Sequence, residues 1–116
     1  MVMPESLLLE FRSSLLELKE ELEESLVGLR EMSKPIAPDD AIGRLSRVDA
    51  MQQQKMAQNQ RASAEARLRL VHAALDAMSR DEYGICRVCE DEIDHRRLRA
   101  RPESMVCVGC QSAQGG

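Results

Sequence analysis

The chain has 116 residues, with one Phe, one Tyr and no Trp, and its 16 basic and 20 acidic side chains leave a net charge of −4. A mildly acidic chain has no general attraction for nucleic-acid phosphates, and so few aromatic side chains cannot build a bulky globular core. The abundant Leu, Ala, Glu, Gln and Arg are typical of long helices instead. No run of eighteen apolar residues and no basic signal-peptide region are present, so we expect a cytoplasmic protein without a membrane span.

Residues 5–33 are predicted to form one amphipathic helix. Apolar side chains recur at steps of three and four, as at the a and d positions of a heptad repeat, with Ser25 as an interruption. The series consists of Leu8, Phe11, Leu15, Leu18, Leu22, Leu29 and Met32. The charged stretch 17–24 is expected to be the solvated outer face of this helix.

A turn at residues 34–40 separates this helix from a second one, predicted over residues 41–80. Pro35 and Pro38 forbid a continuous helix, and Asp39 or Asp40 can cap the next one. A short connection makes the two helices antiparallel neighbours. The middle of the second helix carries Met, Ala, Ser and Gln in place of large aliphatic residues, so we expect it to be the least stable part.

All four cysteines lie in two C-x-x-C pairs near the C-terminal end of the sequence. Cys86 and Cys89 are separated by seventeen residues (90–106) from Cys107 and Cys110, a spacing typical of zinc sites. Four thiolates fill a tetrahedral zinc ion, so the sequence predicts one structural Zn²⁺ and no enzyme. Disulfides would need an oxidising compartment, a thioredoxin-type site would need a βαβ unit, and an iron–sulfur cluster fits the paired spacing less well.

The segment between the two cysteine pairs supplies charge and a few apolar side chains. His95 is a spare metal donor that four thiolates make unnecessary. The arginines Arg96, Arg97, Arg99 and Arg101 are matched by nearby acids, so direct DNA binding is not expected, and they offset those acids or contact an acidic protein surface. A small apolar cluster is expected from Tyr83, Ile85, Ile93, Leu98, Val106 and Val108.

The stretch "DEYGICRVCEDEIDHRRLRARPESMVCVGCQ", residues 81–111, resembles the zinc finger of the DksA/TraR family of bacterial transcription regulators. The matching features are the acid and aromatic before G-x-C-x-x-C, the following E-I, the R-R-L-x-A-R-P run and the closing C-x-x-C-Q. The resemblance implies a mainly α protein. It has a long antiparallel two-helix coiled-coil hairpin over residues 1–80, with its tip at 34–40, and a small four-cysteine zinc finger over residues 81–116.

The resemblance also implies a partner, RNA polymerase, whose secondary channel receives the tip of the hairpin so that initiation is modulated. Family members carry a D-x-x-D-x-A tip motif that is absent here, and the available substitutes are Asp39, Asp40 and the pair Asp49–Ala50. Arg96, Arg97, Arg99 and Arg101 become candidate docking residues. Arg101 matches a family arginine used for the alarmone ppGpp, but Leu70 stands where the family has a lysine, so we do not expect a full ppGpp response.

A zinc-stabilised adaptor or oligomerisation protein without polymerase activity is the alternative that the sequence leaves open. The heptad pattern supports it equally well, because the same apolar positions can pair between chains. Binding to core polymerase is the observation that separates the two.

Overall fold

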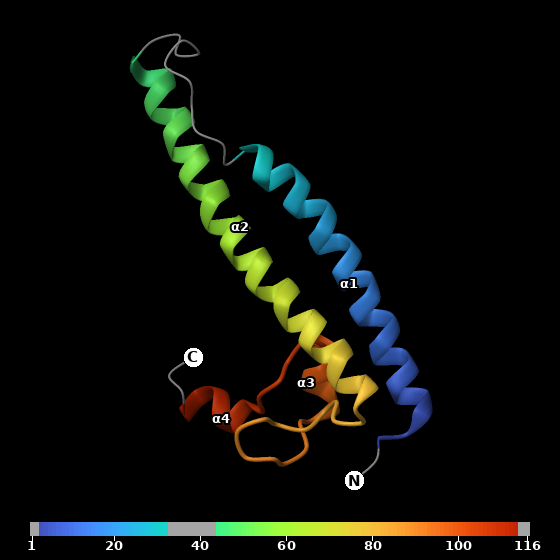
Figure 1. Cartoon of the computed structure of the whole chain (residues 1–116). Coiled ribbons are helices and arrows are strands. Elements are labelled where there is room, and N and C mark those ends of the chain that lie inside the picture. Colours follow the sequence, from blue (N-terminus) through green and yellow to red (C-terminus); the bar gives the residue numbers. More distant parts are fainter. Residues whose placement is uncertain (1–2, 33–43, 114–116) are drawn as a thin grey trace. The chain divides into compact units, whose positions relative to one another are not determined.

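Four helices account for the regular structure that the computed structural model describes, which covers residues 3–32 and 44–113 (Figure 1). They are α1 (Glu5–Met32), α2 (Arg44–Ser79), α3 (His95–Ala100) and α4 (Val108–Ala113). In this part of the chain, strand pairing is limited to an isolated bridge between Ile85 and Glu92. None of the helices in it has the length and apolarity that a membrane span requires. The predicted mainly α fold is confirmed.

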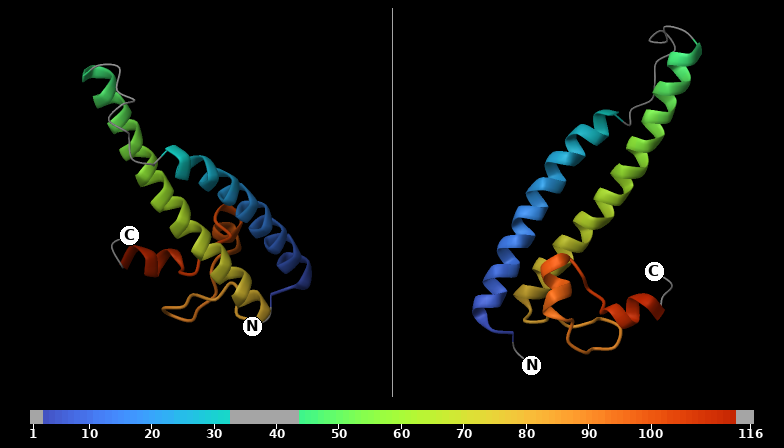
Figure 2. Two further views of the ribbon diagram at one scale, coloured as in Figure 1. Left: turned by 45° about the horizontal axis from the view of Figure 1, so that its top comes forward. Right: turned by 180° about the vertical axis from the view of Figure 1, so that it is seen from behind.

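The described residues pack as two units. Unit 1 contains α1 up to Glu20, α2 from Arg67 onward, and the segment that follows α2, and unit 2 contains α1 from Glu21 and α2 up to Ala66. Each unit therefore holds a stretch of α1 beside an antiparallel stretch of α2 (Figure 1, Figure 2). This confirms the predicted pairing of the two long helices. The division at residue 80 between a hairpin domain and a finger domain stays a prediction.

Unit 1 has a core to which both long helices and the cysteine segment contribute. Phe11 and Leu15 come from α1, while the small residues Ala74 and Ala77 of α2 allow close approach of the neighbouring backbone. The cysteine segment adds the buried side chains of Tyr83, Cys86, Ile93, Leu98 and Val106. The rings of Phe11 and Tyr83 lie 5.8 Å apart, so α1 contacts the cysteine segment directly. The cysteine segment and the two helices therefore share one core in this unit.

The described side chains of unit 2, at residues 21–32 and 48–66, bury less apolar surface. Leu22, Leu26 and Ala57 are buried among them, whereas Val27, Met32, Val48, Met51 and Met56 are exposed. Because burial of apolar area supplies most of the free energy that holds paired helices together, these stretches of the two helices contribute little to stability. In the middle of α2, the small residue Ala57 is buried while Met51 and Met56 are exposed, as the shortage of large apolar residues there led us to expect.

Three details of the predicted core are wrong. Leu26 is buried although the strict heptad passed through Ser25, and Met32, at the end of that series, is 60% exposed. Leu15 and Leu26 are eleven residues apart, a repeat of 3.67 residues per turn that follows a nearly straight helix better than 3.5 does. Val108 is 56% exposed because it lies inside the second C-x-x-C turn, whose cysteines face inward.

The chain leaves α2 through a tight turn that directs it into the core. The N–H of Glu82 donates to the carbonyl of Ala77 at 2.8 Å and the N–H of Asp81 donates to that of Met78 at 3.2 Å. Asp81 takes a left-handed backbone with φ 57°, as a Schellman helix end requires. Tyr83 follows at once and donates its hydroxyl to the carbonyl of Pro102 at 2.8 Å. Burial raises the pKa of Tyr83, and the charge of Glu103 adds to this.

Leu15→Ala is expected to destabilise the protein strongly, and its neighbour offers a matched control. Leu15 is fully buried whereas Leu16 is 46% exposed on the same helix. Removing a buried leucine side chain costs about 2–5 kcal/mol through lost burial and the cavity left behind. Leu16→Ala, with the same change in helix propensity, is expected to cost less than about 1 kcal/mol. Urea unfolding followed by circular dichroism measures both, and equal losses would contradict the core described here.

Candidate metal centre

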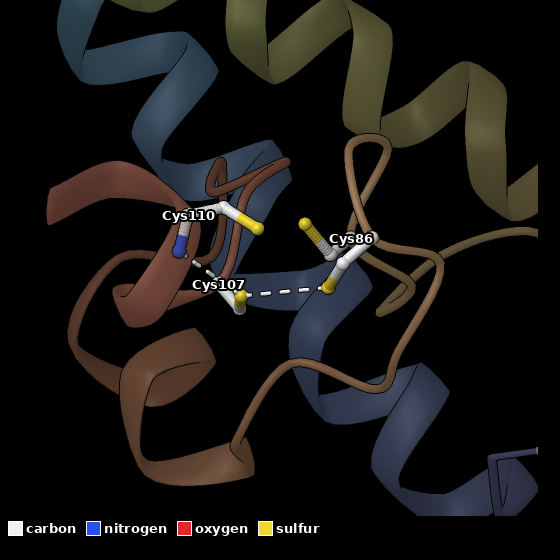
Figure 3. A group of neighbouring side chains, drawn as sticks. Cys86, Cys107 and Cys110 are labelled. Atoms are coloured by element: carbon white, nitrogen blue, oxygen red, sulfur yellow. Dashed lines mark hydrogen bonds between the residues drawn. The ribbon is translucent and has the colours of Figure 1, made fainter. Parts of the chain in front are cut away.

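All four cysteines meet in unit 1. Their sulfur atoms lie within 4.8 Å of one another, and no other group of three or more potential metal ligands occurs among the described residues. Figure 3 shows the sulfurs of Cys86, Cys107 and Cys110 facing a common centre. Cys86 and Cys89 come from the loop between α2 and α3, whereas Cys107 precedes α4 and Cys110 lies within it. Two segments distant in sequence thus supply two sulfurs each.

Backbone hydrogen bonds shape the first cysteine pair into a tight turn. The N–H of Glu90 donates to the carbonyl of Cys86 at 2.9 Å, and the N–H of Cys86 donates to the backbone carbonyl of Asp91 at 2.8 Å. Glu90 has φ 65°, the left-handed conformation that reverses the chain here. The N–H of Val88 approaches the Cys86 sulfur at 3.4 Å. The turn therefore brings both sulfurs to one side and offers a backbone N–H to one of them.

The second pair uses the start of α4 for the same purpose. The N–H of Gln111 donates to the carbonyl of Cys107 at 2.9 Å, and the N–H of Cys110 points to the Cys107 sulfur at 3.5 Å (Figure 3). A further hydrogen bond, from the N–H of Arg87 to the carbonyl of Met105 at 3.0 Å, connects the first cysteine turn to the segment that precedes the second cysteine pair. The relative position of the two pairs is thus set by the backbone.

The geometry of the sulfurs fits a zinc ion. In a tetrahedral site with Zn–S bonds of about 2.3 Å, neighbouring sulfurs are about 3.8 Å apart. The sulfurs of Cys89 and Cys107 are 3.7 Å apart. The widest separation allowed by the 4.8 Å limit exceeds the ideal edge by about 1 Å, which small side-chain rotations can close.

The protonation of the four thiols also calls for a cation. Backbone N–H groups, foremost that of Cys89, lower the pKa of Cys86 to about 6. The hydrogen bond with the Cys107 sulfur is the main cause that raises the pKa of Cys110 to about 12. Four thiolates at this spacing repel one another unless a divalent ion neutralises them, and zinc does so. The four cysteines fill its coordination sphere, so the zinc site is structural.

His95, the spare donor, is not part of the cluster. Its ring lies at 6.2 Å from the ring of Phe11 in an edge-to-face arrangement, and it is half-buried at the start of α3. Asp94 caps that helix, accepting a bond from the N–H of Arg96 at 2.8 Å, and this bond lowers the pKa of the Asp94 carboxyl. His95 thus packs the finger against α1 and leaves the metal to the cysteines.

The four arginines between the cysteine pairs have different partners and surroundings. Each has a polar partner within unit 1: Arg96 pairs with Asp94 at 3.4 Å, Arg97 donates to the carbonyl of Val106 at 3.1 Å, Arg99 pairs with Glu10 at 3.5 Å, and Arg101 pairs with Glu103 at 3.7 Å. Of these four, Arg97 and Arg101 line a common cavity, and Arg96 and Arg99 do not.

This cavity, called the arginine cavity below, has a volume of about 470 Å³. Its walls include Leu70, Arg87, Arg97, Arg101, Glu103 and Gln111. Sequence reasoning missed Glu103, which is almost completely buried and pairs with Arg67 at 2.5 Å across 36 positions. No sequence pattern joins residues at that separation, and only the folded chain shows that they meet.

Of the candidate tip residues, Asp49 and Ala50 lie within the described part of the chain. Asp39 and Asp40, with the rest of the predicted tip at 34–40, lie outside the described residues. Asp49 is exposed and Ala50 half-buried on α2, in unit 2. Their roles stay predictions.

Purified protein is expected to contain one zinc ion per chain. Cys107→Ser removes a ligand with little change in volume, so the zinc content should fall well below one. His95→Gln is the control. It removes the histidine that lies between the two cysteine pairs in the sequence, and it should retain the full zinc content. Elemental analysis after dialysis against a mild chelator gives both values. Zinc retained by Cys107→Ser and lost by His95→Gln would contradict the ligand set.

Comparisons with known proteins agree with this geometry. A family model described as the prokaryotic dksA/traR C4-type zinc finger matches residues 81–114. A segment of 45 residues, 39% of this chain, is 36% identical to the RNA polymerase-binding transcription factor DksA of Haemophilus influenzae, and it spans 31% of that protein. An uncharacterised protein of Aquifex aeolicus is 32% identical over 103 residues, which are 89% of this chain and 68% of that one.

The fold is shared with a solved structure as well. Transcription factor DksA2 from Pseudomonas aeruginosa matches 96% of this chain and 84% of its own, with a TM-score of 0.74 and 23% identity. That similarity extends to the paired helices, beyond the residues that the zinc-finger model matches. On the family match and the clustered cysteines, residues 81–114 form a zinc finger of the DksA/TraR C4 type, and the chain shares the fold of DksA2.

Proposed function

We propose that this protein is a non-enzymatic, cytoplasmic transcription regulator that binds RNA polymerase directly and modulates initiation by inserting the end of its helix pair into the secondary channel. The observation that carries the proposal is the finger at residues 81–114, whose family includes a named RNA polymerase-binding factor. A closed zinc site offers no place for a substrate, so the finger acts through the surface that it supports.

The core of unit 1 supports this proposal mechanically. Phe11 of α1, Val71 of α2 and Leu98 of α3 are all almost completely buried in it. A finger that shares a core with two helices keeps a fixed orientation relative to them. Docking the finger on a partner would therefore also fix the orientation of the unit 1 stretches of α1 and α2.

Acidic residues near the turn between the helices are proposed to act at the inserted end. Asp39 and Asp40 belong to the predicted tip, and Asp49 with Ala50 follows on α2. A carboxylate there can pair with a basic group or a bound metal ion of the polymerase. For Asp39 and Asp40, helix capping is the competing role.

The arginine cavity is the part of the finger that we propose contacts the polymerase. Arg97 and Arg101 line it, whereas Arg96 lies outside it, is 88% exposed and pairs with its neighbour Asp94. Leu70 forms part of the same wall. An aliphatic side chain at that position cannot pair with a phosphate, which supports the expectation that ppGpp is not fully sensed.

An adaptor or self-associating protein is the second candidate. The exposed Val27, Met32, Val48, Met51 and Met56 of unit 2 favour it, because exposed apolar side chains in number are a common feature of interfaces. Under the first proposal the same residues would lie against the walls of the channel.

Binding to purified core RNA polymerase is expected for the zinc-loaded wild type, and a known secondary-channel factor should compete with it. Fluorescence anisotropy with a labelled chain measures both the affinity and the competition. The absence of binding at micromolar polymerase would remove the proposal. Binding without competition would remove the channel and leave an adaptor.

Neutralising the proposed tip is expected to abolish the effect on transcription with little loss of binding. Asp39→Asn/Asp40→Asn and, separately, Asp49→Asn remove the charge and keep the size of each side chain. Asp91→Asn, at an exposed acid of the finger, is the control. Promoter-specific in vitro transcription gives the readout. If the double variant and Asp49→Asn both act as the wild type and the control do, none of these three acids works at the tip.

Arg101→Gln is expected to weaken polymerase binding by about tenfold or more, since loss of a charged contact at an interface typically costs at least about 1.4 kcal/mol. Arg96→Gln makes the same change at a site outside the cavity and should have a smaller effect. The anisotropy assay compares the two, and an equal loss for both would contradict a docking role centred on the cavity.

A further inference from the structure

Two arginines from different elements of unit 1 converge on one buried carboxylate. Arg67, on α2, places its Nε atom 2.5 Å from Oε2 of Glu103. Arg101, which follows α3, places its Nε atom 3.7 Å from the same oxygen. Arg87 and Arg97 bring further positive charge to the wall of the arginine cavity. Glu103 thus pairs with two guanidinium groups and shares the cavity wall with two further arginines.

The burial of Glu103 differs sharply from that of its partners. Its side chain is 2% exposed, while those of Arg67 and Arg101 are 38% and 61% exposed. A carboxylate is found in such a position only when opposite charges hold it there. The arrangement places the negative charge inside and leaves the arginines in contact with solvent.

The pairing is also incomplete. Oε1 of Glu103 is buried and has no hydrogen-bond partner among the described residues. A bidentate arginine pair would satisfy both oxygens, and neither Arg67 nor Arg101 does so here. Both arginines therefore hold Glu103 through Oε2, and the carboxylate does not fully match the donors around it.

We propose that Glu103 is an internal anion that occupies the seat made by Arg67 and Arg101 and so keeps phosphate-like anions out of the arginine cavity. The chain supplies its own negative charge where an external one would otherwise bind. Removal of that charge should open the cavity to inorganic pyrophosphate. The inference does not depend on polymerase binding, because it concerns the isolated chain.

A purely structural ion pair would behave differently. If Glu103 serves only to join the finger to α2, its neutralisation should cost stability and create no affinity for anions. The distinguishing readout is therefore the binding of an anion by the folded variant.

The test is a calorimetric titration of the zinc-loaded chain with inorganic pyrophosphate at constant ionic strength, with zinc content measured after each titration. The wild type should show no saturable binding up to millimolar pyrophosphate. Glu103→Gln, which is isosteric, should bind at least about tenfold more tightly, since it removes a like charge beside the anion. Glu92→Gln, at an exposed acid of the finger, makes the same change in net charge and should behave as the wild type does.

A double variant locates the binding that Glu103→Gln acquires. Arg101→Gln/Glu103→Gln should lose most of the affinity, because one side of the seat is gone. The proposal is overturned if the wild type binds micromolar pyrophosphate, if Glu103→Gln binds no better than Glu92→Gln, or if the double variant keeps the affinity. Should Glu103→Gln fail to retain zinc, Glu103→Asp decides by the same comparison. It keeps the charge, retracts it by one methylene from Arg67, and should bind more tightly than the wild type.

Discussion

Repulsion among four thiolates is the constraint on which the rest of this structure depends. Their sulfurs lie within 4.8 Å of one another, and a divalent ion is needed to hold them there in charged form. The ion joins a turn before α3 to the start of α4, and between these two points the chain places Ile93, Leu98 and Val106 in the core. Because Phe11 and Leu15 of α1 contribute to the same core, the metal stabilises the helix pair as well as the finger.

The two units differ in the contacts that stabilise them. Unit 1 has the metal, the aromatic contact between Phe11 and Tyr83 and the buried pair of Arg67 with Glu103. The described side chains of unit 2 form a thin core of Leu22, Leu26 and Ala57, with several exposed methionines. A region with few buried contacts opens locally at low free-energy cost and adapts to the surface that it meets. Under the proposed function, this is the region that would adapt to the polymerase.

Sequence reasoning was most successful where local chemistry decides the structure. The spacing of Cys86, Cys89, Cys107 and Cys110 predicted the metal cluster, and the spacing of apolar residues together with the positions of the prolines predicted both long helices. It was less successful where the answer depends on three-dimensional packing. A strict heptad passed through Ser25 although the helix buries Leu26, and Val108 was placed in a core from which the C-x-x-C turn directs it outward. The pair of Arg67 and Glu103 joins residues 36 positions apart, and neither residue belongs to a motif.

The most direct test of this account is amide hydrogen exchange with and without zinc. Zinc removal is predicted to increase exchange at residues 83–106 and also in α1 around Phe11 and Leu15, because these segments share one core with the metal site. Exchange in α2 between Met51 and Ala62 should change little, since that stretch belongs to unit 2. Faster exchange confined to the two cysteine turns, with α1 unaffected, would contradict the claim that the metal supports the helix pair.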